Sequence, residues 1–122
     1  MWLSVEQGGG KSYAIRLKSI LLCSKHAGIT IMIVRKTYAE LIANHIKPFK
    51  EMLHIGKKGS PATYNSSEKE LRFINGSTIL FRYCDSEKDV DRYQGTEVDV
   101  LFIDECTHQS EERFKKLTAC VR

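Results

Sequence analysis

A glycine-rich segment near the start of the chain has the composition of a phosphate-binding loop: Gly8, Gly9, Gly10, Lys11 and Ser12. Consecutive glycines let backbone N–H groups approach phosphate oxygens, and the amino end of a following helix adds partial positive charge. In such a loop the ammonium of Lys11 reaches the β- and γ-phosphates, and the hydroxyl of Ser12 ligates magnesium. The segment therefore predicts a site for ATP with Mg²⁺, although a merely flexible glycine loop is the alternative.

Two adjacent carboxylates, Asp104 and Glu105, follow the apolar run 100–103 far downstream. Ligands of parallel sheets bind at the carboxyl ends of the strands, and neighbouring strand residues point in opposite directions. The two acids can therefore divide the work, with Asp104 holding magnesium and Glu105 orienting or deprotonating the attacking water. A polar strand end that faces solvent is the alternative. Together with the glycine segment, the pair favours a nucleoside-triphosphate hydrolase with Lys11 and Glu105 as its catalytic residues.

The elements that must position these residues follow a simple order. Residues 2–5 predict a short strand, residues 12–23 a helix, and residues 29–34 a strand that is apolar on both faces. A third buried strand is expected at residues 98–103. A continuous apolar run is typical of a strand that helices cover on both sides.

A second helix is predicted to begin at Thr37, because Thr37 and Glu40 have the spacing of a capping box. Apolar residues continue at spacings of three and four as far as residue 53. Pro48 lies inside this pattern and predicts a kink or a break there.

The middle and the end of the chain predict smaller features. Residues 57–67 are expected to form a polar loop. Residues 71–74 and 78–81 flank Asn75-Gly76, a pair typical of a two-residue β-hairpin, and a last helix is expected over residues 110–121. The predicted fold is α/β, with a mostly parallel sheet flanked by helices and a β-hairpin insertion.

Length and composition are those of a single globular domain. The chain has 122 residues, of which 42% are hydrophobic and 28% charged, and a net charge of +4. The charges are scattered, so they are compatible with a polyanion partner and equally with an ordinary solvated surface. The four cysteines lack the spacing of a metal site, which favours reduced thiols in a cytoplasmic protein. No apolar run approaches the roughly 20 residues that span a bilayer, so no membrane partner is expected.

The order of the motifs resembles the large terminase subunit of tailed bacteriophages, with a P-loop NTPase-like ATPase domain. Besides the glycine segment and the acidic pair, the resemblance includes three stretches: Ile33-Val34-Arg35-Lys36-Thr37, followed by Glu40-Leu41; Arg92-Tyr93-Gln94-Gly95-Thr96; and residues 114–122. It implies that residues 1–122 form part of a packaging motor domain that binds and hydrolyses ATP in the host bacterial cytoplasm. It also implies double-stranded DNA, a portal and a small terminase subunit as partners, and a homo-oligomeric ring in the full-length protein.

The chain also departs from the family pattern. Members commonly have Gly and Arg where this chain has Val5 and Gln7. The resemblance further implies that the domain is incomplete at the carboxyl end and that the family's nuclease domain lies outside these residues. A central strand would then be missing between the phosphate-loop strand and the acidic strand, which would leave two unpaired edges. A helicase-like nucleic-acid-dependent ATPase and a catalytically inactive nucleotide-binding remnant stay open as alternatives.

Four further residues have side chains that could act at such a site. Arg35 and Lys36 follow the second strand and are interpreted as solvated, with contact to phosphate or DNA as the alternative. Gln94 is a hypothetical sensor near the acidic strand. His108 has no second histidine at a useful spacing and is interpreted as a surface residue.

Overall fold

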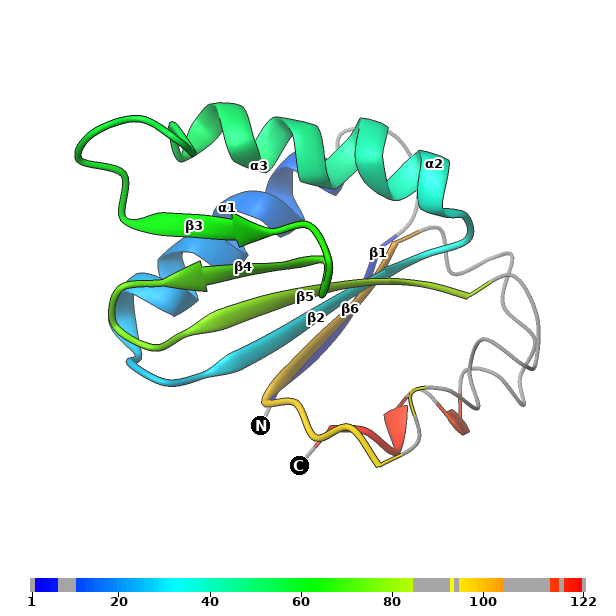
Figure 1. The fold of residues 1–122 in the computed structure, drawn as a ribbon. Helices are drawn as coiled ribbons and strands as arrows, with labels where there is room; N and C mark the ends of the chain where they lie inside the picture. Colours follow the sequence, from blue (N-terminus) through cyan, green and yellow to red (C-terminus); the bar gives the residue numbers. More distant parts are fainter. Residues whose placement is uncertain are drawn as a thin grey trace.

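The structure, a computed structural model, describes residues 2–6, 11–84, 93, 95–104, 115–116 and 118–121, with the backbone alone for residues 2–6 and 11. Within these residues a six-stranded sheet has the order β1-β6-β2-β5-β4-β3 (Figure 1). Its strands are β1 (Trp2–Glu6), β2 (Thr30–Arg35), β3 (Ala62–Asn65), β4 (Glu70–Phe73), β5 (Thr78–Tyr83) and β6 (Val100–Asp104).

Parallel and antiparallel pairing divide this sheet into two parts. The neighbours from β1 through β6 and β2 to β5 run parallel, whereas β5, β4 and β3 pair antiparallel. The predicted α/β fold with a hairpin beside a parallel core is therefore confirmed in outline. The sheet is only partly parallel, because β3 extends the antiparallel part by one more strand.

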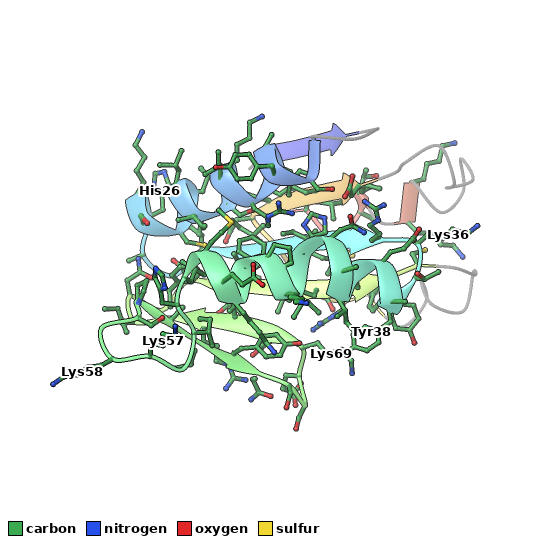
Figure 2. The ribbon with its side chains drawn as sticks, turned by 90° about the horizontal axis from the view of Figure 1, so that it is seen from above. His26, Lys36, Tyr38, Lys57, Lys58 and Lys69 are labelled. Carbon is green, nitrogen blue, oxygen red and sulfur yellow. The ribbon has the colours of Figure 1, made fainter. Side chains whose placement is uncertain are left out.

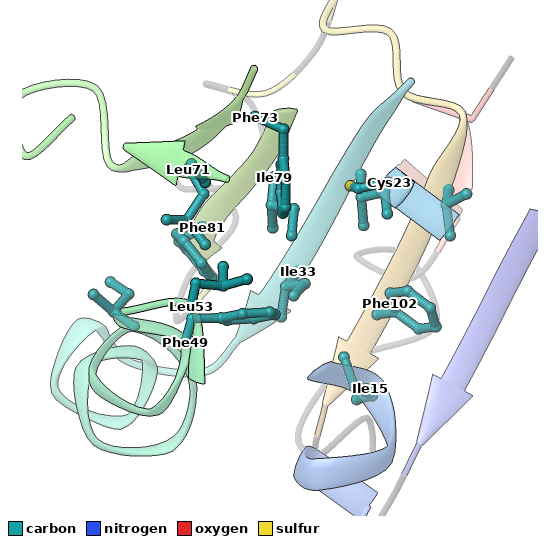
Figure 3. Close-up of a cluster of buried hydrophobic side chains, with 14 of the residues drawn as sticks. Ile15, Cys23, Ile33, Phe49, Leu53, Leu71, Phe73, Ile79, Phe81 and Phe102 are labelled. Carbon is teal, nitrogen blue, oxygen red and sulfur yellow. The ribbon is translucent and has the colours of Figure 1, made fainter. Parts of the chain in front are cut away.

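Four consecutive or neighbouring helical segments near the amino end and in the middle of the chain lie together over one face of the sheet (Figure 1). They are α1 (Lys11–Lys25), α2 (Tyr38–Leu41), the π-helical turn η1 (Ile42–Ile46) and α3 (Lys47–Met52). Ile15 and Cys23 of α1 and Phe49 of α3 are fully buried against the strands in one apolar cluster (Figure 3). In that cluster the Phe49 and Phe81 rings lie 5.6 Å apart, centroid to centroid.

The two central strands are apolar on both faces, as their sequences predict. Ile31 and Ile33 of β2 belong to the cluster beneath the helices, whereas Met32 and Val34 belong to a second cluster on the opposite face. The second cluster also contains Tyr93, Val98 and Cys120. Every residue of β6 is buried, so the strand that ends in Asp104 is held from both faces.

The second helix begins where it was predicted. The hydroxyl of Thr37 accepts a hydrogen bond from the backbone N–H of Glu40 at 3.2 Å, which is one half of a capping box. The Glu40 side chain is directed toward Arg35, and its Oε2 lies 3.9 Å from Nε of Arg35.

The irregularity expected at Pro48 is the π-helical turn η1, which comes directly before α3. Proline has no N–H to bond the carbonyl four residues earlier, and in this helix that carbonyl belongs to Asn44. The Arg16 guanidinium of α1 donates to the Asn44 carbonyl instead. The break in the helical hydrogen bonds therefore anchors this helix to α1.

A hairpin at Asn75-Gly76 is confirmed, with β4 and β5 on either side of it. Its loop is longer than the predicted two residues, since Phe73 N–H donates to the Ser77 carbonyl at 2.8 Å. Gly76 has φ +90°, a left-handed conformation that suits glycine. The Asn75 side chain accepts from Ser77 N–H at 3.0 Å and donates to the Cys23 carbonyl at 2.6 Å. The turn therefore also holds the end of α1.

The expectation of a polar loop over residues 57–67 is wrong for part of that range. Residues Ala62–Asn65 form β3 and pair antiparallel with β4. Ala62 is buried, and the ring of Tyr64 lies 6.3 Å from that of Phe81. A strand this short and polar is defined mainly by the partner with which it pairs, so its own composition does not predict it.

The expected gap beside the acidic strand is not present. β1 pairs directly with β6 over five residue pairs, from Trp2↔Val100 to Glu6↔Asp104, and β2 pairs with the other side of β6. Direct pairing satisfies backbone N–H and carbonyl groups that are costly to leave buried without partners.

The predicted last helix lies largely outside the described residues. Of its range, residues 115, 116 and 118 are helical, and Val121 forms an isolated parallel bridge with Val98. In the part of the chain that the structure describes, no helix is long and apolar enough to cross a membrane.

Candidate functional site

The site lies where the first helix begins and the acidic strand ends. Glu6 and Asp104 are paired at the ends of β1 and β6, so the chain leaves β1 beside this carboxylate. Ser12 is in the first turn of α1, and its Oγ donates a hydrogen bond to Asp104 Oδ2 at 2.6 Å. The structure therefore brings together the two residues predicted as magnesium ligands.

Arg35, the last residue of β2, contacts the same carboxylate. The pairing Val34↔Ile103 puts the next residue of each strand, Arg35 and Asp104, at the same edge of the sheet. Arg35 Nη1 lies 2.5 Å from Asp104 Oδ2 and 3.5 Å from Ser12 Oγ. Arg35 is only 9% exposed. The interpretation of Arg35 as solvated is therefore wrong, since strand pairing directs its side chain to a buried acid.

Lys36 behaves differently from its neighbour. Its side chain projects away from the molecule, as does that of Lys58 (Figure 2). Lys69 instead lies over the Tyr38 ring, with Nζ 5.2 Å from the centroid. These positions agree with the scattered charge of the sequence.

His45 is a third donor that sequence reasoning missed. It lies in the π-helical turn η1, is fully buried, and has its Nε2 2.9 Å from Asp104 Oδ2. Its place in the sequence contains a clue, since it lies three residues after Ile42 and four before Phe49, within the apolar stripe of the helix. A polar residue on such a stripe needs a buried partner, and only the fold identifies that partner as Asp104.

These contacts determine the charge of the site. Burial opposes ionisation of Asp104, but hydrogen bonds from His45, Ser12 and Arg35 outweigh it and lower the pKa of this carboxyl to about 2. Burial lowers the pKa of His45 below its ordinary value, against the opposing effect of Asp104. Near neutral pH the site therefore contains a carboxylate, a guanidinium and a neutral imidazole that donates through Nε2.

The two oxygens of Asp104 have different surroundings. Oδ2 accepts from all three donors, whereas the buried Oδ1 has no hydrogen-bond partner among the described residues. A carboxylate oxygen and a serine hydroxyl are hard ligands of the kind that Mg²⁺ prefers, and Mg²⁺ sites commonly use one or two protein oxygens together with water and phosphate. Ser12 and Asp104 therefore fit this ion.

Several predicted site residues lie outside the described residues: Gly8, Gly9, Gly10, Glu105, Gln94 and His108. Lys11 is described as the first residue of α1, and its side chain is not described. Their predicted roles stay predictions.

Nearly the whole chain matches a known protein family. The sequence model of the phage terminase large subunit family matches residues 3–122. The chain belongs to this family. The resemblance inferred from the order of the motifs is therefore confirmed.

Individual relatives agree with this assignment. The PBSX phage terminase large subunit of Bacillus subtilis (strain 168) is 28% identical over 116 residues, which are 94% of this chain and 26% of the relative. This terminase sequence thus spans about a quarter of the curated relative that it matches.

Solved structures show the same fold. Two crystal forms of the large terminase from the thermophilic bacteriophage D6E superpose with TM-scores of 0.69 and 0.73, at 21% and 22% identity. Each covers 98% of this chain, which corresponds to 30% of the D6E protein. The second of these structures is a complex with ADP.

Proposed function

We propose that this chain carries the nucleotide-binding part of the ATPase motor of a phage DNA-packaging terminase. The observation that supports this most directly is the 2.6 Å hydrogen bond from Ser12 Oγ to Asp104 Oδ2. It joins Ser12, which follows the lysine of the glycine loop, to Asp104, the acid at the end of a buried parallel strand. Few sites other than a magnesium-nucleotide site need these two groups side by side.

The phosphates of ATP would be bound at the amino end of α1. Backbone N–H groups of Gly8, Gly9 and Gly10 are proposed to donate to phosphate oxygens, and Lys11 to neutralise the β- and γ-phosphates. α1 has 15 residues and begins at Lys11, directly after this loop, so its partial positive charge falls on the same place. The ADP complex of the D6E terminase supports an adenine nucleotide as ligand.

Ser12 and Asp104 are proposed to hold Mg²⁺, and Glu105 to orient or deprotonate the attacking water. When bound, the ion would neutralise charge that develops on the phosphates. The Asp104 carboxylate suits this role because its low pKa keeps it ionised throughout the neutral range. His45 would help to orient this carboxylate through its 2.9 Å contact with the same oxygen, Oδ2.

The wider context of the proposal comes from the family. Double-stranded DNA is the proposed substrate of the motor, with a portal and a small terminase subunit as partners. A homo-oligomeric ring in the host bacterial cytoplasm is the proposed assembly. Family membership favours this function over that of a helicase.

A nucleotide-binding chain without turnover is the second candidate. Gln7 stands where family members commonly have an arginine, and the loss of a cation near the transferred phosphate lowers turnover more than binding. ATPase and binding measurements on the same protein separate the two candidates.

The proposal is tested by titrating the protein with a fluorescent ADP analogue in Mg²⁺ and in EDTA. Because Lys11 contributes charge-assisted hydrogen bonds, Lys11→Ala is expected to weaken binding by at least about tenfold. Lys25→Ala is the matched control, since Lys25 is an exposed lysine in the last turn of the same helix. Equal affinities for the two variants would exclude the glycine loop as the phosphate site.

A further inference from the structure

We propose that Arg35 competes with a divalent ion for Asp104: its guanidinium neutralises this carboxylate, and it transfers to Glu40 when the ion binds. The inference rests on the proposed magnesium role of Ser12 and Asp104. It adds a regulatory device that uses two residues outside the glycine loop and the acidic pair.

The first argument is the crowding of one oxygen atom. Asp104 Oδ2 accepts from Arg35 at 2.5 Å, from Ser12 at 2.6 Å and from His45 at 2.9 Å. A carboxylate oxygen has two lone pairs, so three donors saturate it. Asp104 is therefore a fully engaged acceptor at Oδ2.

The second argument is charge. Asp104 is fully buried and Arg35 is 9% exposed. Among the described side chains Arg35 is the arginine in hydrogen-bond contact with Asp104, and the charge of Arg16 also acts on this carboxylate. A divalent ion added beside an unmoved guanidinium would meet strong repulsion at low local dielectric.

The third argument is that Arg35 contacts both proposed metal ligands. Its Nη1 is 3.5 Å from Ser12 Oγ as well as 2.5 Å from Asp104 Oδ2. The Ser12 hydroxyl can keep its hydrogen bond to Asp104 while a lone pair ligates an ion, but its lone pairs also face Arg35 Nη1. An ion bound between Ser12 and Asp104 would therefore lie beside the Arg35 guanidinium.

The fourth argument is that a second acceptor is close to Arg35. Glu40 Oε2 lies 3.9 Å from Arg35 Nε, and this buried oxygen has no hydrogen-bond partner among the described residues. The Glu40 backbone is held in place by the cap bond to Thr37. A small rotation of the guanidinium would give this carboxylate the bonds that Asp104 gives up.

The transfer would reach beyond the site itself. Glu40 lies in α2, and α2 continues directly into η1, where His45 donates to Asp104. Arg35 and His45 thus connect the metal position to one continuous helical segment. Loading of the site would change the charge at the start of this segment.

The test uses Mn²⁺ alone as the probe and measures its affinity by electron paramagnetic resonance in four proteins. Arg35→Gln is expected to bind Mn²⁺ at least about tenfold more tightly than the wild type, because the competing cation is gone. Glu40→Gln is expected to bind it more weakly, because the guanidinium loses its second acceptor. Arg72→Gln is the matched control, since Arg72 pairs with Glu70 on the surface of β4, and it should leave the affinity unchanged.

Thermal unfolding gives a readout that does not need bound nucleotide. In EDTA, Arg35→Gln should unfold at a lower temperature than the wild type, and Mn²⁺ should raise its midpoint more than that of the wild type. If Arg35→Gln does not fold, Arg35→Lys replaces it, since lysine keeps the charge but lacks the forked donors of the guanidinium. Arg35→Lys should bind Mn²⁺ more tightly than the wild type, by a smaller factor than is expected for Arg35→Gln.

Three results would overturn the proposal. The first is unchanged or weaker Mn²⁺ affinity in Arg35→Gln, or in Arg35→Lys where that variant replaces it. The others are stronger Mn²⁺ affinity in Glu40→Gln and no Mn²⁺ binding by any of the four proteins. Failure of the proposed function is recognised separately, as absence of nucleotide binding by the wild type. The ranking of the four proteins by Mn²⁺ affinity can be measured whether or not the wild type binds nucleotide.

Discussion

Ser12 Oγ lies 2.6 Å from Asp104 Oδ2, although 92 positions separate the two residues in the sequence. The contact depends on two features of the fold. Direct pairing of β1 with β6 brings the start of α1 to the end of the acidic strand, and burial of every residue of β6 holds that strand in place. The candidate site is thus a consequence of the parallel core.

Replacement of the acid tests how strongly the site depends on this pair. Asp104→Asn removes the carboxylate that contacts Arg35 at 2.5 Å and leaves this buried guanidinium the more distant Glu40, 3.9 Å from its Nε. We expect the free energy of unfolding to fall by about 3 kcal/mol, the order found when one partner of a buried ion pair is removed. Urea denaturation in EDTA measures the change.

A surface pair provides the control for this substitution. Glu70→Gln breaks the contact of Glu70 with Arg72, whose side chain is half exposed. This loss should be smaller, about 1 kcal/mol, because the Arg72 end of the pair is open to solvent although the Glu70 side chain is only 14% exposed. Equal losses from the two substitutions would show that Asp104 and Arg35 are not coupled as the structure describes.

The stability of the metal-free protein should decrease in acid. The pKa of Asp104 is lowered from 3.8 to about 2. The unfolded chain therefore takes up this proton first, and about 2 kcal/mol of stability present above pH 4 is lost as the pH falls toward 2. The pKa of His45 is also lowered from 6.5, so its contribution, present above pH 6.5, begins to disappear below that pH.

Urea denaturation at a series of pH values measures this dependence. Asp104→Asn cannot titrate at this position, so its stability should change less between pH 4 and pH 2 than that of the wild type. An identical slope for both proteins in that range would contradict the assigned pKa of Asp104.

The parts of the fold that sequence predicts are those that local patterns define. The strand before the glycine loop, the helix after it and the Asn75-Gly76 hairpin each follow from residue types within a few positions of one another. The position of Asp104 at the end of a buried strand follows from the apolar run before it. These features need no knowledge of which strands are neighbours.

The parts that sequence does not predict depend on contacts between distant segments. Arg35 looks like a solvated residue until β2 is paired with β6, and the partner of His45 is known only once η1 is packed over Asp104. β3 has a polar sequence, and it forms a strand because it pairs antiparallel with β4. In each case a tertiary partner overrides the local preference.

The cysteine of α1 should be chemically inert in the folded protein. Cys23 is fully buried, and burial raises the pKa of its thiol to about 12. At pH 8 almost none of it is thiolate, the form that iodoacetamide alkylates. Mass spectrometry after brief labelling should find Cys23 unmodified in native buffer and modified in urea. Comparable labelling in both conditions would contradict the packing of α1 on the sheet.

Glu105→Gln separates binding from chemistry in the proposed motor. The substitution keeps size and hydrogen bonding but removes the carboxylate that is proposed to activate water. Nucleotide affinity in Mg²⁺ should stay within about twofold of the wild type, whereas turnover should fall by about 10²–10⁴-fold, the usual contribution of a general base. Phosphate release measured at saturating ATP checks turnover, and the fluorescent ADP analogue checks affinity.

Glu97→Gln is a suitable control for this experiment, since Glu97 is another carboxylate close in sequence and lies before β6 rather than after it. It should leave both quantities unchanged. Turnover that survives in Glu105→Gln would move the role of the base to another residue. Turnover absent from the wild type as well, with affinity intact, would instead favour the chain that binds nucleotide without hydrolysing it, because Gln7 supplies no cation to the transferred phosphate.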